Sequence, residues 1–149
     1  YGGPSFAQIA ELVDRYGDAT TELARLLRTV VFTAAIGNAD AHGKNLSLII
    51  DTDTGAVALA PLYDTVPTAL WPTLRATPAM SVNGRFDRPS FHDCIAEARR
   101  WGMGATAAER VVEGALTIIR SAAAASEHAA VAELVSSRID AIEASRGAS

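Results

Sequence analysis

The sequence lacks several features that would assign it to a special class of protein. It has one cysteine, Cys94, which excludes an internal disulfide and is typical of a reducing compartment. It has no apolar run long enough to span a bilayer and no charged start followed by an apolar stretch, so nothing directs it to a membrane or to export. We therefore expect a cytoplasmic protein. The 149 residues are 49% hydrophobic, which is enough for one folded globular domain.

Positive charge is also scarce. The 13 Lys and Arg residues are outnumbered by 17 Asp and Glu residues, and the formal net charge is −4. Broad, nonspecific binding to nucleic acid needs a concentration of Lys and Arg that releases counterions, so this balance argues against it. An initiator methionine is missing as well, because the chain begins "YGGPSF", and we expect it to be part of a longer or processed protein.

Apolar periodicity predicts a mainly α-helical domain. Residues 5–16 form a rough helical stripe after a Gly-Gly-Pro breaker, and residues 21–36 follow the i, i+3, i+4, i+7 pattern until Gly37 stops the helix. Further helices are expected over 89–101, 106–124 and 129–145.

The first two of these later helices have capping signals. The spacing of Ser90 and Asp93 predicts a capping box at the start of the first, and Thr106 with Glu109 predicts the start of the second.

A small β-hairpin interrupts the helices. The apolar runs "LSLII" (46–50) and "AVALA" (56–60) flank "DTDTG" (51–55), whose residues are turn formers. Residues 71–88, punctuated by Pro72, Pro78 and Gly84, predict a long irregular connection with one short strand near "AMSV" (79–82). The predicted fold class is mainly α with a small β-hairpin.

A polar cluster, "GNADAHGKN" (37–45), lies between the long helix and the hairpin. Gly, Asn and Asp are common in turns, so a plain helix-to-strand turn is one interpretation. The five-residue step from Asp40 to Asn45 also matches the protein-kinase catalytic loop. A carboxylate at the start of such a loop can orient an attacking hydroxyl and accept its proton, and an amide oxygen at its end can bind magnesium.

A second magnesium carboxylate would have to come from elsewhere in the chain. "PLYDTVP" (61–67) presents Asp64 just after the returning strand of the hairpin. Because a hairpin brings its two ends together, we expect Asn45 and Asp64 to converge on one site although they are far apart in sequence.

The segment "IGNADAHGKNLSLI" (36–49) followed by "LAPLYDTV" (59–66) resembles the C-terminal half of the HipA family, the atypical serine/threonine kinases of bacterial toxin–antitoxin modules. "YGGPSFAQIAELV" (1–13) is similar to the Gly-Gly-Pro segment that precedes this helix in the family. The resemblance implies that residues 1–149 form a protein-kinase-like C-terminal lobe, an atypical kinase fold. The family's N-terminal lobe, with its nucleotide-binding loop and lysine, has no counterpart in these residues.

The resemblance also implies roles for individual residues. Asp40 becomes the catalytic Asp, Asn45 a magnesium ligand and Asp64 the counterpart of the DFG Asp. The resemblance also implies contacts with the nucleotide. His42, Gly43 and Lys44 would lie along its phosphates. Tyr63, Thr65 and Val66, which flank Asp64, would lie at the nucleotide as well.

Some of these residues have simpler interpretations. In a loop of this kind His42 is expected to fix the loop by hydrogen bonding rather than to act as a general base, and Lys44 is equally compatible with a solvated surface lysine. Trp71 and Trp101 are expected in the core or in a groove wall.

If the resemblance holds, the cofactors are ATP and Mg²⁺ and the acceptor is a Ser or Thr of a protein such as a translation factor or a tRNA-charging enzyme. The partner is a helix-turn-helix antitoxin, HipB-like, which would connect the chain to DNA only indirectly. Two alternatives stay open: a catalytically inactive interaction module that binds an antitoxin, and another kinase-like small-molecule phosphotransferase. The aminoglycoside and choline kinases usually have a His where this chain has Asn38. A metal phosphohydrolase is disfavoured because no second histidine lies at ligand spacing from His42.

Overall fold

The computed structural model describes residues 3–71, 73–74 and 77–147, so that Tyr1, Gly2 and the predicted breaker Pro72 lie outside the described residues. Within these ranges the chain forms five α-helices and one two-stranded antiparallel sheet, which confirms the predicted fold class. The helices are α1 (Phe6–Tyr16), α2 (Ala19–Ile36), α3 (Phe91–Arg100), α4 (Ala105–Ala124) and α5 (Ala129–Glu143); the strands are β1 (Leu48–Ile50) and β2 (Val57–Leu59); the 3-10 turns are η1 (Gly43–Asn45), η2 (Thr68–Leu70) and η3 (Ala144–Gly147). In the described part of the chain no helix is both long and apolar enough to cross a membrane.

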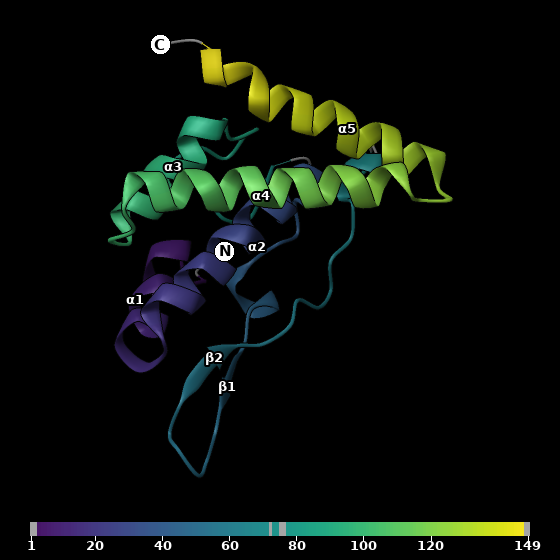
Figure 1. Cartoon of the computed structure of the whole chain (residues 1–149). Coiled ribbons are helices and arrows are strands. Elements are labelled where there is room, and N and C mark those ends of the chain that lie inside the picture. Colours follow the sequence, from purple (N-terminus) through teal and green to yellow (C-terminus); the bar gives the residue numbers. More distant parts are fainter. Residues whose placement is uncertain (1–2, 72, 75–76, 148–149) are drawn as a thin grey trace.

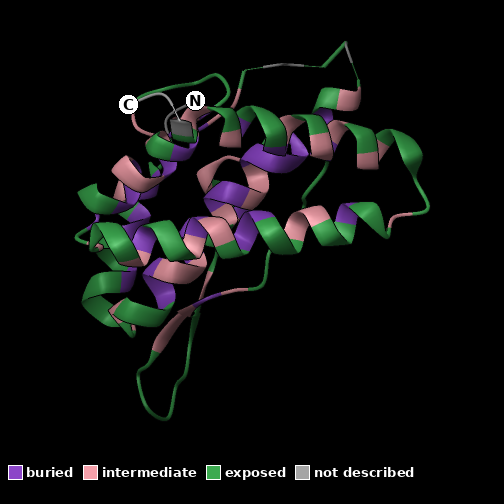
Figure 2. Ribbon diagram, turned by 45° about the horizontal axis from the view of Figure 1, so that its top comes forward, coloured by how far each residue is buried: buried purple, intermediate pink, exposed green. Residues whose placement is uncertain are grey.

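Helix α2 is the centre of the core. It contacts α1, α3, α4 and α5, and its inward face is fully buried along Leu26, Leu27, Val30 and Val31. Figure 1 shows α4 and α5 running side by side, while the hairpin projects away from the helices. Figure 2 shows that burial is concentrated on the facing sides of the helices and that the hairpin tip is exposed. The apolar stripes predicted from the sequence are therefore the surfaces that meet in the core.

Both ends of α2 are fixed by local chemistry. The helix begins two residues earlier than predicted because the Asp18 carboxylate accepts hydrogen bonds from the Thr20 and Thr21 backbone N–H groups. It ends at Gly37, which has φ +68°, and a Cβ atom there would lie 2.8 Å from the Cβ of Ala69. Only glycine meets both conditions, so the direction in which the chain leaves α2 toward the polar cluster is set by this residue.

The hairpin is anchored to the N-terminal end of α2. The buried Glu22 carboxylate accepts a hydrogen bond of 2.6 Å from the Leu59 N–H and pairs with Arg25 at 3.1 Å. Gly17 approaches β2 so closely that a Cβ atom there would lie 2.6 Å from the Val57 carbonyl oxygen. These contacts hold β2 against the junction of α1 and α2.

In the later part of the chain the helices form where the sequence predicts them, but two predicted details are wrong. The capping box of Ser90 and Asp93 is present at the start of α3. The predicted start of α4 at Thr106 and Glu109 was wrong: Gly104 is the N-cap and gives no side-chain cap. The predicted strand near 79–82 was also wrong: Val82 makes an isolated bridge to Arg85 around a tight turn, and no other strand of the described ranges pairs with it.

Candidate active site

Asp40 lies in a loop whose backbone is held rigidly. The buried Asn38 accepts a 3.0 Å hydrogen bond from the Asp40 N–H through its side-chain Oδ1, and its own N–H donates to the Thr33 carbonyl at the end of α2. Asp40 itself is exposed, and its carboxylate has no hydrogen-bond partner among the described residues. The loop thus presents an unpaired carboxylate on a fixed backbone, which is what a proton acceptor requires.

A second set of contacts holds the same loop from the far side of the hairpin. The buried Thr68 hydroxyl accepts a 2.7 Å hydrogen bond from the Ala39 N–H and donates to the Gly37 carbonyl at 3.0 Å. The Ala69 N–H donates to the same carbonyl, and the Ala79 N–H donates to the Ala39 carbonyl. Sequence reasoning missed Thr68, because a threonine after Pro67 has no signature that distinguishes it from any other loop residue.

Asn45 and Asp64 come together as the hairpin predicted. The Asn45 Nδ2 atom donates to the Asp64 Oδ2 atom at 3.1 Å and to the Asp64 carbonyl at 3.4 Å. Asn45 is buried, and Asp64 has φ +54°, one of two positive values among the described non-glycine residues. A left-handed backbone at a residue other than glycine is strained and is often retained where function needs it.

The donor set of this pair fits Mg²⁺. Asn45 uses its amide N–H₂ group for the bonds to Asp64, which leaves its amide oxygen available to a cation beside the carboxylate. Across the described ranges no group of three or more His, Cys, Asp or Glu residues could hold a metal by itself. Mg²⁺ is commonly held by one or two side-chain oxygens, with water and substrate phosphates completing its shell. The pair therefore suits a magnesium ion brought with a nucleotide and not an all-protein metal site.

His42 differs from its expected role. Its Nδ1 atom is buried and has no hydrogen-bond partner among the described residues, so the prediction that hydrogen bonding by His42 fixes the loop was wrong for this nitrogen. The residue lines a small cavity of about 10 Å³ together with Asn45 and Asp64. An unsatisfied buried nitrogen costs about 1–3 kcal/mol, and such atoms in native proteins call for an explanation such as a ligand.

Two neighbouring residues of the predicted site, Gly43 and Tyr63, make close contacts with other parts of the chain. Gly43 lies against the Gly-Gly-Pro segment, because a Cβ atom on it would be 2.5 Å from two ring carbons of Pro4. The Tyr63 hydroxyl donates to the Lys44 carbonyl at 2.7 Å and lies 2.7 Å from the Ser47 hydroxyl. Tyr63 thereby ties the segment after β2 to the loop before β1.

The other predicted residues are close by but make no diagnostic contact. Thr65 lines the same small cavity, and Val66 and Lys44 are exposed. Contacts of Lys44, Tyr63, Thr65 and Val66 with a nucleotide stay predictions. Trp101 is buried, as expected.

Comparison with known proteins gives the family of the chain and its fold. Residues 1–130 match the family model described as the HipA-like C-terminal domain. A protein of Sinorhizobium fredii (strain NBRC 101917 / NGR234) named "Putative kinase Y4mE" is 41% identical over 85 residues, which are 56% of this chain and 20% of that protein. HipA in the solved complex of the Shewanella oneidensis MR-1 toxin–antitoxin system with HipB and operator DNA has a TM-score of 0.74 at 21% identity, with 96% of this chain and 35% of that chain covered.

These matches differ in what they support. The Shewanella structure shows that the chain has the fold of part of HipA, and the chain covers only about a third of that protein and a fifth of the Sinorhizobium one. The family model covers the α1–α2 region, the polar loop, the hairpin, α3 and α4. The chain belongs to the family of HipA-like C-terminal domains.

Proposed function

We propose that this chain is the C-terminal lobe of a HipA-like serine/threonine protein kinase. One observation carries the proposal: Asn45, at the end of the loop that presents the unpaired, exposed carboxylate of Asp40, meets Asp64 at 3.1 Å. A proton acceptor next to a pair of oxygen ligands is the arrangement that phosphoryl transfer to a hydroxyl requires. Membership of the HipA-like family and a relative named as a kinase support the same function.

Each residue has a defined task in this proposal. Asp40 would orient the hydroxyl of a protein Ser or Thr and accept its proton, and the bond from Asn38 Oδ1 to the Asp40 backbone keeps that carboxylate in place. Asn45 and Asp64 would hold Mg²⁺. When bound, ATP and Mg²⁺ would supply the transferable phosphoryl group and neutralise its charge.

The remaining roles belong to residues around the small cavity. His42, Gly43 and Lys44 would lie along the nucleotide phosphates, and the unpartnered Nδ1 of His42 gives this region a polar atom that a bound group could satisfy. Tyr63, Thr65 and Val66 would flank the nucleotide beside Asp64.

The decisive experiment replaces Asp40 in the full protein that its gene encodes. Asp40→Asn should lower the rate of phosphate transfer from labelled ATP to protein by about 10²–10⁴-fold, the contribution of a positioned proton acceptor. Its melting temperature should not change, since the carboxylate is exposed and unpaired. Asp53→Asn, a change at the exposed turn of the hairpin, is the matched control and should leave both quantities unchanged. Transfer at the normal rate by Asp40→Asn would refute the assignment.

A HipB-like helix-turn-helix antitoxin is the partner that we propose, with DNA contacted through it. The similarity to a HipA solved with HipB and operator DNA supports this partner. Translation factors and tRNA-charging enzymes are the proposed class of substrate, by family resemblance alone.

An interaction module without catalysis is the second candidate, because the chain covers 35% of that HipA chain. It would be favoured if the full protein bound the antitoxin yet showed no thermal shift with ATP and Mg²⁺ and no transfer.

A further inference from the structure

A cavity of about 370 Å³ lies beside the Asp40 loop and adjoins the small cavity of Asn45 and Asp64, with which it shares Asn38, Ala41 and Met80. Ala39 and Ala41, the two neighbours of Asp40 in sequence, both line it. Its other walls come from the last turn of α2, the segment that follows η2, the segment that precedes α3, and Arg138 of α5. A group held in this cavity would therefore lie against the two residues that flank Asp40 in the loop.

The walls of the cavity are largely apolar, and several are exposed. Trp71 and Leu74 line it with about half of their surface accessible, at 48% and 50%. Met80 and Val82 line it as buried residues. Exposed aromatic and aliphatic side chains around a concave site are typical of surfaces that bind another molecule.

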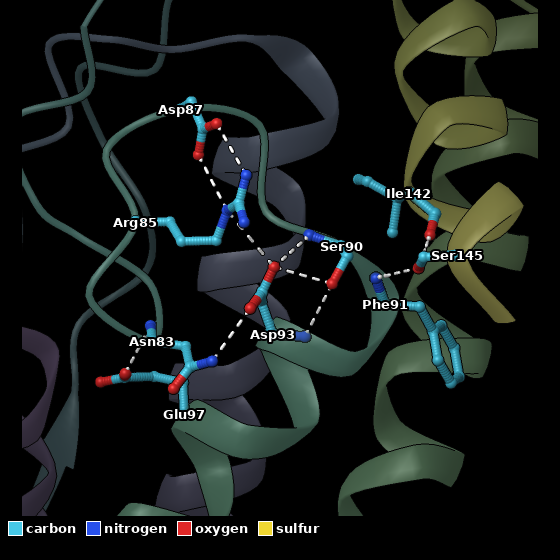
Figure 3. A network of polar contacts seen from close by, with 9 residues as sticks. All are labelled: Asn83, Arg85, Asp87, Ser90, Phe91, Asp93, Glu97, Ile142 and Ser145. Atoms are coloured by element: carbon cyan, nitrogen blue, oxygen red, sulfur yellow. Dashed lines mark hydrogen bonds and ion pairs between the residues drawn. The ribbon is translucent and has the colours of Figure 1, made fainter. Parts of the chain in front are cut away.

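The charge in the cavity is positive, and carboxylates in the described part of the chain compensate only part of it. Three arginines and one carboxylate line it, and the carboxylate of Asp87 is already held by Arg85 through two hydrogen bonds of 3.0 and 2.8 Å (Figure 3). Arg88 and Arg138 have no carboxylate within 4 Å in the described part of the chain. The cavity thus has two guanidinium groups whose charge is unpaired.

Arg138 is fixed in position as well as unpaired. Its Nε atom donates a 2.7 Å hydrogen bond to the Ala34 carbonyl at the end of α2, and the terminal nitrogens of its guanidinium are left for another acceptor. Burial lowers the pKa of Arg138, and the positive charge of Arg88 lowers it further. Both effects mean that an anion entering the cavity would be stabilised.

The rim of the cavity near α3 is preformed. Figure 3 shows the segment before α3 tied to that helix through Asp93, which accepts hydrogen bonds from the Asn83 side chain and from the Ser90 backbone and hydroxyl. Arg85 is held by Asp87 and lies 3.6 Å from Asp93. Binding at this rim would therefore cost little ordering of the protein.

We propose that this cavity docks the protein segment that carries the accepting hydroxyl, and that it selects segments with an acidic side chain next to an apolar one. The inference rests on the proposed kinase function and adds the substrate class. An apolar side chain would pack against Trp71 and Leu74, and a carboxylate would be held by Arg88 and Arg138. Aromatic residues and arginines are the residue types that contribute most to protein recognition, and a guanidinium matches a carboxylate in shape and charge.

The test uses fluorescein-labelled nine-residue peptides with a central serine in a Gly/Ala background. Each contains one Leu and, at each position in turn, Glu, Gln, Lys or phosphoserine. Binding to the full protein, without nucleotide, is measured by anisotropy and by quenching of Trp71, with Trp71→Phe as the control that removes the local signal. Peptides that pair Leu with Glu should bind about tenfold more tightly than their Gln counterparts, the size of one charge-assisted hydrogen bond.

A charge exchange sharpens the test. Arg88→Glu should weaken binding of the Glu peptides by about tenfold and should give the Lys peptides the advantage instead. Arg99→Glu is the matched control, because Arg99 is an exposed arginine of α3 that does not line the cavity. It should leave the preference for Glu intact.

The outcomes separate docking from catalysis. No preference for Glu over Gln, equal effects of Arg88→Glu and Arg99→Glu, or binding of phosphoserine peptides without the Glu peptides would each overturn the docking proposal. None of these results bears on Asp40, because the binding measurement contains no nucleotide. Conversely, normal phosphate transfer by Asp40→Asn would overturn the kinase assignment whatever the peptides do.

Discussion

The two residues other than glycine that have a left-handed backbone in the described part of the chain lie in two polar clusters, and these clusters differ in how many of their polar groups are hydrogen-bonded. Asp64 (φ +54°) belongs to the site cluster with Asp40, His42 and Asn45, and Asn83 (φ +52°) belongs to the α3 cluster drawn in Figure 3. In the site cluster, neither the Asp40 carboxylate nor the buried Nδ1 of His42 has a hydrogen-bond partner among the residues that the structure describes.

The α3 cluster is closed on itself. The Asp93 carboxylate accepts bonds from Asn83 and Ser90, and Glu97 accepts from the Asn83 backbone N–H and from the Trp101 indole. Clusters with similar residue types and similar backbone strain can therefore have two different roles. A polar cluster whose groups are all paired stabilises the fold, whereas one with unpaired groups is available to a ligand.

The charges of the two clusters also act differently. Partial burial raises the pKa of Asp93, but hydrogen bonds from Asn83 and Ser90 and the charge of Arg85 outweigh it, so the pKa lies below its usual range. Burial, together with the charges of Asp93 and Glu97, raises the pKa of the Cys94 thiol to about 12. Cys94 is therefore a core residue and not a nucleophile.

The largest expected difference between the clusters is in phosphate transfer. Asp64→Asn keeps the size of the side chain and a residue type that tolerates a left-handed backbone, but it removes the charge beside Asn45. We expect the transfer rate of the full protein to fall by about 10²-fold or more, with a change in the free energy of unfolding below about 0.5 kcal/mol.

The same substitution in the α3 cluster is the control for this prediction. Asp93→Asn should keep phosphate transfer within about twofold of the unsubstituted protein. Equal losses of phosphate transfer in Asp64→Asn and Asp93→Asn would show that the site cluster has no special role in catalysis.

The next largest effect is on the free energy of unfolding, and here we expect the α3 cluster to be more sensitive than the site cluster. Asp93→Ala removes the acceptor for Asn83 and Ser90 and should lower the free energy of unfolding by about 2 kcal/mol in urea titrations. The buried thiol of Cys94, one residue further along α3, should react faster with a disulfide reagent. The change at exposed Asp87, Asp87→Ala, should cost less than about 0.5 kcal/mol. If Asp93→Ala were as stable as Asp87→Ala, the closed cluster would not be a stabilising one.

Much of the fold and part of the site could be predicted from the sequence because the signals were local. The apolar stripes predicted which faces of the helices are buried in the core, Gly37 predicted the end of α2, and the turn-forming residues predicted the hairpin. The approach of Asn45 to Asp64 followed from the hairpin alone, since its two ends must meet.

The residues that the sequence did not reveal act across long separations. Thr68 holds the Asp40 loop, Glu22 holds β2, and Arg138 reaches the end of α2 from α5. Nothing in the immediate neighbourhood of these residues marks them. Their partners are chosen by packing, which a local pattern does not encode.

A smaller effect tests whether the buried position of His42 lowers the stability of the protein and serves ligand binding. His42→Leu replaces a buried, unpaired nitrogen with an apolar side chain and should stabilise the protein by about 1 kcal/mol in thermal or urea unfolding. The thermal shift produced by ATP and Mg²⁺ in the full protein should decrease at the same time. His92→Leu, a change at an exposed histidine of α3, is the control and should do neither. A loss of stability in His42→Leu would show that the imidazole is a structural member of the loop.

The smallest expected effect is the pH dependence that the α3 cluster contributes. Because the folded-state pKa of Asp93 is lowered, its contribution to stability is fully present above the unfolded value, about 3.9, and is lost as the pH falls through the folded value. Urea titrations at pH 7, 5, 4 and 3 should therefore show less acid destabilisation for Asp93→Asn than for the unsubstituted protein. Asn83→Gly, which permits the left-handed backbone and removes one donor, should fall between them. If Asp93→Asn lost stability with acid as steeply as the unsubstituted protein, the hydrogen bonds in Figure 3 would not be the source of the lowered pKa.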